Sequence, residues 1–361
     1  MYRRPPRSVC FSMVGARREW YTFDLSDKYG ITCGPRSLHS VGAEHSHLGT
    51  LENCRCLRRP TFCDDAVKEF GHQVGWALLG NHLYCLGRGG TVLAISLFRP
   101  EEGWKRRSRM LAHDAHYFDS VVAVRGKLYV LGWGGGGEDQ PWAEVYDPVS
   151  DSWEPLPEPP GGPLRPEEYF GSLMAGDSEE GYLVFLESSE KLLRYDVEKK
   201  SWRCYSNLPR LPSVDSTGRR TICVGHVLYW FSAETGQLHA YDFRNQVGYS
   251  SELVDWTFGC NSCSCWDKPQ PATLGHLGGK RFCLLYATDP ELNPWRKMST
   301  PTSYPKPEPS SAPEIFENKT LLHCLKFRVR LVPQRESLKI SLESCQAYLV
   351  KAGEVQDGFM V

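Results

Sequence analysis

The stretch GKLYVLGWGGGGEDQPWAEVYDPVSDSWEPLPE, residues 126–158, decides the fold of this chain. It runs from an apolar segment through four glycines, Gly134 to Gly137, to a Val-Tyr-Asp triplet, and then to Trp153, seven residues after Tyr146. A phosphate-binding loop would need its glycines to lead into a helix, commonly through Gly-Lys-Ser/Thr. Gly137 leads instead to Glu-Asp-Gln-Pro and an expected strand. The glycines therefore indicate a tight connection between strands, because glycine accepts positive φ angles.

The order of this stretch recurs along the chain. Tyr195 starts a second Tyr-Asp pair and is followed seven residues later by Trp202, which lies 49 residues after Trp153. Trp104 precedes Trp153 by the same 49 residues, and Tyr241 starts a further Tyr-Asp pair. A period of about 45 to 50 residues is typical of repeat proteins in which one small sheet stacks on the next.

Each repeat predicts four short strands. In the repeat that contains the quoted stretch they are expected over residues 117–124, 127–132, 142–146 and 152–156. These runs are rich in Val, Leu and Tyr and are bounded by Gly, Pro, Asp and Ser, which is the pattern of short strands. A sheet this small cannot bury both of its faces alone, so neighbouring repeats must stack on it, and radial stacking gives a β-propeller.

We therefore expect an all-β fold, a β-propeller of four-stranded blades with six blades. It should form a single domain over residues 1–361, with blades starting near residues 8, 72, 117, 168, 219 and 272. The strands expected over 320–332 and 337–350 should close the ring against the N-terminal strands, because an open ring leaves bare sheet edges. The repeated Trp153 and Trp202 should be largely buried between blades.

Composition excludes several classes of protein. Lys and Arg number 42 against 43 Asp and Glu, a net charge of −1, so nothing indicates a nucleic acid or a membrane as partner. No apolar run approaches the roughly 18 residues that span a bilayer. The 14 cysteines are irregularly spaced, which favours reduced thiols and a location in the cytoplasm, the nucleus or both.

Two clusters of metal-ligating residue types occur in expected loops. The densest is CNSCSC, with Cys260, Cys263 and Cys265, whose spacing could hold zinc but lacks two regular Cys-x-x-Cys halves. The other is a group of histidines, His39, His45 and His47. Loop thiols and loop histidines are more often solvated than ligands, and no base marks a nucleophilic cysteine. We therefore assign no catalytic residue, no cofactor and no metal, and whether the cysteines bind metal stays open.

The repeat resembles the kelch motif. In that family a glycine doublet closes the second strand, a tyrosine lies on the third and a tryptophan on the fourth. Gly89-Gly90 with Trp104 matches this pattern, as does Gly135-Gly136 with Tyr146 and Trp153. The resemblance extends over most of the chain, but only these two repeats match well. It implies an adaptor or substrate-recognition propeller of the plant F-box/kelch-like type.

Kelch propellers are frequently fused to an F-box or a BTB domain. Only about ten residues precede the first expected strand, so we expect no F-box here. Components of a ubiquitin ligase are suggested as partners by the family resemblance alone.

The long connections indicate where a partner binds. We expect the segments Asp27–Phe70, Trp256–Pro271 and Ser299–Glu314 to gather on one face, because second-to-third and blade-to-blade connections share a face. The Pro-rich 299–314 segment should be a flexible loop within the last blade. A protein partner would then be anchored by Trp266 and Tyr304, since aromatic residues dominate binding energy at interfaces. The alternative is a propeller-scaffold enzyme with a metal or thiol site on the same loop face.

Overall fold

The computed structural model describes residues 8–14, 18–25, 55–56, 62–63, 75–111, 121–131, 141–160, 173–177, 180–188, 191–206, 221–232, 237–252, 273–288, 319–351 and 354–360. Within these ranges the chain consists of strands, turns and three short 3₁₀ turns at Arg88–Gly90, Pro100–Glu102 and Pro333–Arg335. No helix in the described part of the chain has the length and apolarity needed to cross a membrane.

Three sheets each contain four consecutive antiparallel strands. The first of them comprises β5 (Gly75–Leu79), β6 (His82–Gly87), β7 (Thr91–Ser96) and β8 (Lys105–Arg107). The next comprises β9 (Val121–Val124), β10 (Lys127–Leu131), β11 (Ala143–Asp147) and β12 (Ser152–Pro155). The third comprises β13 (Leu173–Asp177), β14 (Tyr182–Ser188), β15 (Lys191–Asp196) and β16 (Ser201–Ser206). The four strands expected in the repeat that contains the quoted stretch are thus confirmed as β9 to β12.

A larger sheet contains two such four-stranded runs. One run is β17 (Thr221–Val224), β18 (Val227–Ser232), β19 (Gln237–Asp242) and β20 (Val247–Glu252). The other is β21 (Thr273–Gly278), β22 (Arg281–Thr288), β23 (Lys319–Val332) and β24 (Ser337–Lys351). A single parallel pair, Ser250 with Ser337, joins β20 to β24. The short β3 (Arg55–Cys56) pairs in parallel with the far end of β24, at Tyr348 and Leu349.

The remaining sheet joins the two ends of the chain. Its strand order is β25-β1-β2-β4, with β25 (Glu354–Met360), β1 (Ser8–Val14), β2 (Arg18–Asp24) and β4 (Phe62–Cys63). Ring closure was predicted for the strands over 320–332 and 337–350, and this assignment is wrong. Those strands are β23 and β24, which pair with each other and belong to the β21–β24 run, whereas β25 pairs with β1.

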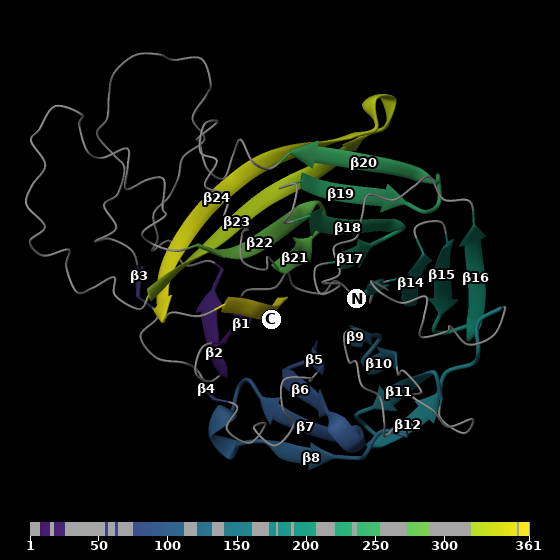
Figure 1. Cartoon of the computed structure of the whole chain (residues 1–361), viewed down its shortest axis with the longest axis vertical. Coiled ribbons are helices and arrows are strands. Elements are labelled where there is room, and N and C mark those ends of the chain that lie inside the picture. The colour runs from purple at the N-terminus through teal and green to yellow at the C-terminus, as the bar shows by residue number, and fades with distance from the viewer. Residues whose placement is uncertain are drawn as a thin grey trace, which may run out of the picture.

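The sheets are arranged around a central axis (Figure 1). The innermost strands β5, β9, β13, β17, β21 and β25 contact one another in this order, and β25 contacts β5. The outermost strands β8, β12, β16, β20 and β24 follow one another around the rim (Figure 1). The predicted fold class, an all-β propeller of four-stranded sheets, is therefore confirmed, while the count of six blades and their starting residues stay predictions.

The repeated Tyr-Asp pairs explain how the third and fourth strands are connected. Each aspartate ends a third strand, and its Oδ1 accepts a backbone N–H of the following turn: Asp147 from Val149 at 2.9 Å, Asp196 from Lys199 at 3.0 Å, Asp242 from Arg244 at 2.9 Å. A positive φ then leads into the fourth strand, at Asp151 (49°), Lys200 (51°) and Gln246 (57°). Side-chain capping of this kind stabilises a tight turn that the backbone alone would not favour.

In two repeats the tyrosine and the tryptophan are directly opposite each other on neighbouring strands. Tyr146 pairs with Trp153 and Tyr195 with Trp202, with ring centroids 4.9 and 4.8 Å apart. Trp153 is buried and packs against residues of the β5–β8 sheet, as predicted. Trp202 was also expected to be largely buried, but it is only half-buried at the rim.

The third Tyr-Asp repeat has no tryptophan, and another aromatic residue takes over its role. Tyr241 is opposite Gly248, so nothing projects from the tryptophan position. Phe243, two residues after the tyrosine, is buried and packs on Tyr182 and Tyr205 of the preceding sheet, at 5.8 and 5.9 Å between ring centroids. An aromatic contact between neighbouring sheets is thus retained without the tryptophan.

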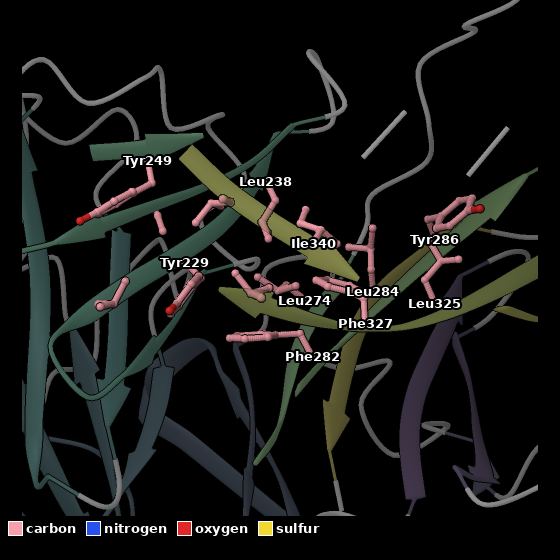
Figure 2. Close-up of a cluster of buried hydrophobic side chains, with 14 residues drawn as sticks. Tyr229, Leu238, Tyr249, Leu274, Phe282, Leu284, Tyr286, Leu325, Phe327 and Ile340 are labelled. Atoms are coloured by element: carbon pink, nitrogen blue, oxygen red, sulfur yellow. The ribbon is translucent and has the colours of Figure 1, made fainter. Parts of the chain in front are cut away.

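One hydrophobic cluster lies between the β17–β20 and β21–β24 runs (Figure 2). Phe282 packs on Tyr229 from the neighbouring run and on Phe327 from the next strand, with ring centroids 4.8 and 6.1 Å apart. Along β23 the odd-numbered positions Leu325, Phe327 and Val329 belong to this cluster. The even-numbered positions Leu322 and Cys324 belong instead to a cluster with β1 and β2, because successive strand residues face opposite sides.

Candidate functional site

The structure restricts which long connections can share a face. The segment Trp256–Pro271 lies between β20 and β21, two consecutive four-stranded runs, and Ser299–Glu314 lies between the second and third strands of the β21–β24 run. Connections of these two kinds leave a blade on the same side. The proposed anchors Trp266 and Tyr304 lie within these segments, outside the described residues.

The expectation for Asp27–Phe70 is wrong. This segment was expected to connect the first blade to the second, but it includes β3 and β4. Because β25 is the innermost strand of the first sheet, β2 is its third strand and β4 its fourth. The chain between them connects a third strand to a fourth strand, on the side where the other third-to-fourth turns lie. The sequence does not show this shift, since it follows from β25 occupying the inner position.

The residue clusters considered for metal binding are not in the described ranges. His39, His45 and His47 lie outside them, as do Cys260, Cys263 and Cys265. Among the residues that are described, no group of three or more His, Cys, Asp or Glu side chains could hold a metal ion. The quoted glycines Gly134 to Gly137 also lie outside the described ranges, and the chain on their two sides forms the paired strands β10 and β11, with Leu131 opposite Ala143.

A charged surface on the outer strands of the β21–β24 run was not anticipated. Past the region that β1 and β2 cover, the even-numbered positions of β23 become exposed, at Arg328 and Arg330. Arg281 of β22 is opposite Arg328, and Lys339 of β24 is opposite Arg330, so these side chains share one face of the sheet. We call Arg281, Arg328, Arg330, Lys339 and Glu343 the charged face.

Glu343 organises two of these cations. Its Oε2 accepts hydrogen bonds from Nε of Arg281 and lies 2.9 Å from Nη2 of the same guanidinium. Its Oε1 accepts a hydrogen bond from Nε of Arg328 at 2.5 Å. Partial burial opposes ionisation of Glu343, but the hydrogen bonds from Arg328 and Arg281 outweigh it and lower the pKa of the carboxyl group. Glu343 is therefore charged at neutral pH and fixes the positions of both arginines.

Strand alternation places Glu343 on this face, because Leu338, Ile340 and Leu342 of β24 all face the core and the residues between and after them face the other way. The pairing of β23 with β24 shifts between Lys326, which is opposite Ser344, and Phe327, which is opposite Leu342. Glu343 is the extra residue of this bulge, so no residue of β23 is directly opposite it. A sequence signal for the site exists in the alternation of Lys326, Arg328 and Arg330 with apolar residues, but the bulge has none.

Lys326 lies on the same face at its buried end. Its Nζ donates a hydrogen bond to the backbone carbonyl of Leu25, next to β2. The side chains of Cys283 and Cys324, with sulfur atoms 3.4 Å apart, are buried on the same side of β22 and β23. The hydrogen bond that Cys283 shares with Cys324, and to a smaller extent burial, raise the pKa of the Cys283 thiol. A thiol held protonated in this way is a poor nucleophile.

Comparison with known proteins agrees with the repeat pattern. The kelch motif matches residues 120–160. A putative F-box/kelch-repeat protein of Arabidopsis thaliana is 30% identical over 127 residues, a match that covers 34% of this chain and 32% of the relative. A second F-box/kelch-repeat protein of Arabidopsis thaliana is 31% identical over 228 residues, covering 52% of this chain and 55% of the relative.

Solved structures add little. A structural genomics protein of unknown function from Bacteroides thetaiotaomicron aligns with a TM-score of 0.40 at 12% identity, over 79% of this chain and 67% of that chain, a likeness too weak to bear on the fold.

The sheets and the turns define a β-propeller, in which the β9–β12 sheet matches the kelch motif. The chain is similar to F-box/kelch-repeat proteins over part of its length, and one of its repeats matches the kelch motif. The matches span 32% and 55% of the lengths of the two relatives described above.

Proposed function

We propose that this kelch-repeat protein is a non-enzymatic interaction module that binds a protein partner through the connections on one side of its ring. The observation that carries the proposal is the sheet order, which assigns Trp256–Pro271 and Ser299–Glu314 to connections that leave on the same side. Loops on a rigid scaffold can vary without disturbing the packing that supports them.

The scaffold beneath these connections supports the same proposal. Buried aromatic residues of neighbouring sheets pack directly against each other, as Tyr84 does on Tyr146 at 5.8 Å between ring centroids. Well-packed sheets hold loop ends in fixed positions, which lowers the entropy cost of binding. We propose Trp266 and Tyr304 as the anchors, and we expect the 299–314 segment to be flexible in the unbound protein.

The partner is proposed to be a protein of the cytoplasm or nucleus. The paired thiols of Cys283 and Cys324 and the exposed thiol of Cys204 suit a reducing compartment. The names of the relatives contain the term F-box, so components of a ubiquitin ligase are the first candidates to look for among captured proteins.

The experiment is affinity capture with the intact chain, followed by mass spectrometry and by reconstitution with each purified candidate. The variant Trp266→Ala/Tyr304→Ala should lose the partner while its thermal unfolding stays unchanged. Val149→Ala is the matched control, because Val149 is an exposed apolar residue at 95% exposure in a third-to-fourth turn, on the other side of the blade. If the double variant captures the reconstituted partner as well as the parent protein does, the anchors are misassigned.

A further inference from the structure

The charged face has more cations than its own carboxylate can neutralise. Four basic side chains, Arg281, Arg328, Arg330 and Lys339, share the surface with Glu343, whose two oxygens already accept hydrogen bonds from Arg281 and Arg328. Arg328, Arg330 and Lys339 are exposed. On a chain with a net charge of −1 this is a local concentration of positive charge that folding alone does not require.

The outer edge of β24, the strand that contains Lys339 and Glu343, is paired over only part of its length. The outer edge of β24 pairs with β20 only at Ser337 and with β3 only at Tyr348 and Leu349. Between those points, from Leu338 to Ala347, no described strand pairs with this edge. An unpaired edge offers a row of backbone donors and acceptors to an extended chain.

Core packing on the buried face of β24 fixes the conformation of this edge. Leu338 and Ile340 belong to the hydrophobic cluster shared with the β17–β20 run (Figure 2). Their neighbour Lys339 must therefore point to the opposite, charged face, because side chains alternate along a strand. The packing of Leu338 and Ile340 in the core thus fixes both the position of the strand edge and the face on which Lys339 lies.

We propose that β24 binds an acidic, extended protein segment as an added strand, with the carboxylates of the segment on Arg330, Lys339 and Arg328. A strand added to this edge would lie about 4.8 Å from β24, and its alternate side chains would project over the charged face. Acidic residues at every second position would then meet the cations. This inference rests on the proposed function, because it names a second binding surface of the same interaction module.

The geometry favours a peptide over a nucleic acid. The cations follow a single strand edge that can exchange backbone hydrogen bonds, which a peptide can use and a phosphate backbone cannot. The chain has no overall excess of positive charge to support binding to nucleic acid.

The test measures fluorescence anisotropy of a labelled peptide in which glutamate alternates with threonine, titrated with the full chain. The variant Arg330→Glu/Lys339→Glu leaves the Glu343 network intact and should weaken binding by at least about tenfold. The matched control is Arg106→Glu/Arg203→Glu, an equal charge change at exposed positions of β8 and β16, which should bind as the parent protein does. Thermal unfolding of each variant checks that it is folded.

Two further probes make the proposal falsifiable. A peptide of the same sequence with N-methylated alternate residues should bind at least about tenfold more weakly, because it cannot pair along a strand edge. Equal binding of the methylated peptide overturns strand addition, and equal loss in the control variant overturns the assignment to this face. Single-stranded DNA that binds more tightly than the peptide and is lost with Arg330→Glu/Lys339→Glu overturns the peptide as ligand. Unchanged partner capture by Trp266→Ala/Tyr304→Ala would overturn the proposed anchors and leave these readouts unaffected, so the two proposals fail separately.

Discussion

The indole Nε1 of Trp153 donates a 2.9 Å hydrogen bond to the backbone carbonyl of Ser108, 45 residues earlier. Trp202 repeats the contact one repeat later, donating to the carbonyl of Pro157 at 3.0 Å across the same 45 residues. Each carbonyl lies just after the outermost strand of the preceding sheet. The repeated tryptophan therefore ties β12 to the end of β8 and β16 to the end of β12, in addition to filling space between the sheets.

Replacing Trp153 should be costly because the contact combines burial with a hydrogen bond. Trp153→Ala should lower the free energy of unfolding by about 3–5 kcal/mol, and Trp153→Phe, which keeps most of the ring contact, by about 1–2 kcal/mol. Urea denaturation measures both. Trp202→Ala should cost less than Trp153→Ala, since its indole is half-buried. An equal cost at both positions would show that burial does not determine the contribution.

Much of this architecture could be predicted from residue spacing. The Tyr-Asp pairs and the tryptophans recur because each repeat needs the same turn cap and the same contact between sheets, so their period reports the blade period. The pattern fails where another residue performs the role, as Phe243 does for the missing tryptophan opposite Tyr241. Phe243 lies in the turn after β19, away from the tryptophan position on the fourth strand, so the spacing of the repeat does not reveal it.

Ring closure and the charged face could not be predicted for a different reason. Both depend on pairings between residues far apart in the chain, namely β1 with β25 and Arg281 with Glu343. The segment EVQDGFM has weak strand character, and only its place at the open edge of β1 makes it a strand. Trp266 and Tyr304 lie outside the described residues, so their role stays a prediction.

The three turn aspartates should contribute unequally to stability. Asp242 is buried and accepts hydrogen bonds from two backbone N–H groups and from Nδ2 of Asn245, at 2.9, 3.0 and 2.7 Å. Asp147 is more exposed and accepts from Val149 at 2.9 Å. Asp242→Ala should therefore cost about 2–3 kcal/mol and Asp147→Ala about 1 kcal/mol, measured by urea denaturation. The reverse order would contradict the assigned turn geometry.

Two strand glycines should respond oppositely to alanine. A Cβ on Gly176 of the inner strand β13 would lie 2.3 Å from Cγ2 of Val124 on the neighbouring inner strand. Gly176→Ala should therefore destabilise the ring by about 1–3 kcal/mol, because the packed strands must separate. A Cβ on Gly248 meets nothing within 4 Å, so Gly248→Ala should be neutral or stabilising by about 0.5–1 kcal/mol. Differential scanning calorimetry of the two variants tests the pair, and a loss of stability at Gly248 would count against the described register.

Stability should fall below neutral pH because of one buried histidine. His323 stacks on Tyr286 with ring centroids 4.6 Å apart, and burial lowers its pKa to about 4. In the unfolded chain the pKa of histidine is about 6.5. Between these values the unfolded chain binds a proton that the folded chain does not, so stability decreases as pH falls from 6.5 towards 4 and is unaffected above about pH 7.

The expected loss from His323 is about 2 kcal/mol at pH 5 relative to pH 7. Urea denaturation at the two pH values measures it. His323→Phe should remove this part of the pH dependence, whereas His226→Gln, at a side chain with 44% exposure, should leave it in place. An unchanged pH dependence in His323→Phe would mean that other groups cause the loss.

The last eight residues should hold the ring closed. β25 is the innermost strand of the first sheet, its Phe359 lies opposite Cys10 and its ring stacks on Trp20 at 6.2 Å. Deleting residues 354–361 would leave the edge of β1 without a partner and expose part of this core, so the melting temperature should fall by at least about 5 °C. Because the lost strand is contiguous, a synthetic peptide of residues 354–361 should restore stability in a concentration-dependent way, as expected for a ligand of the folded state. A scrambled peptide of the same composition is the control. A truncated chain that melts at the parent temperature would show that β25 does not close the ring.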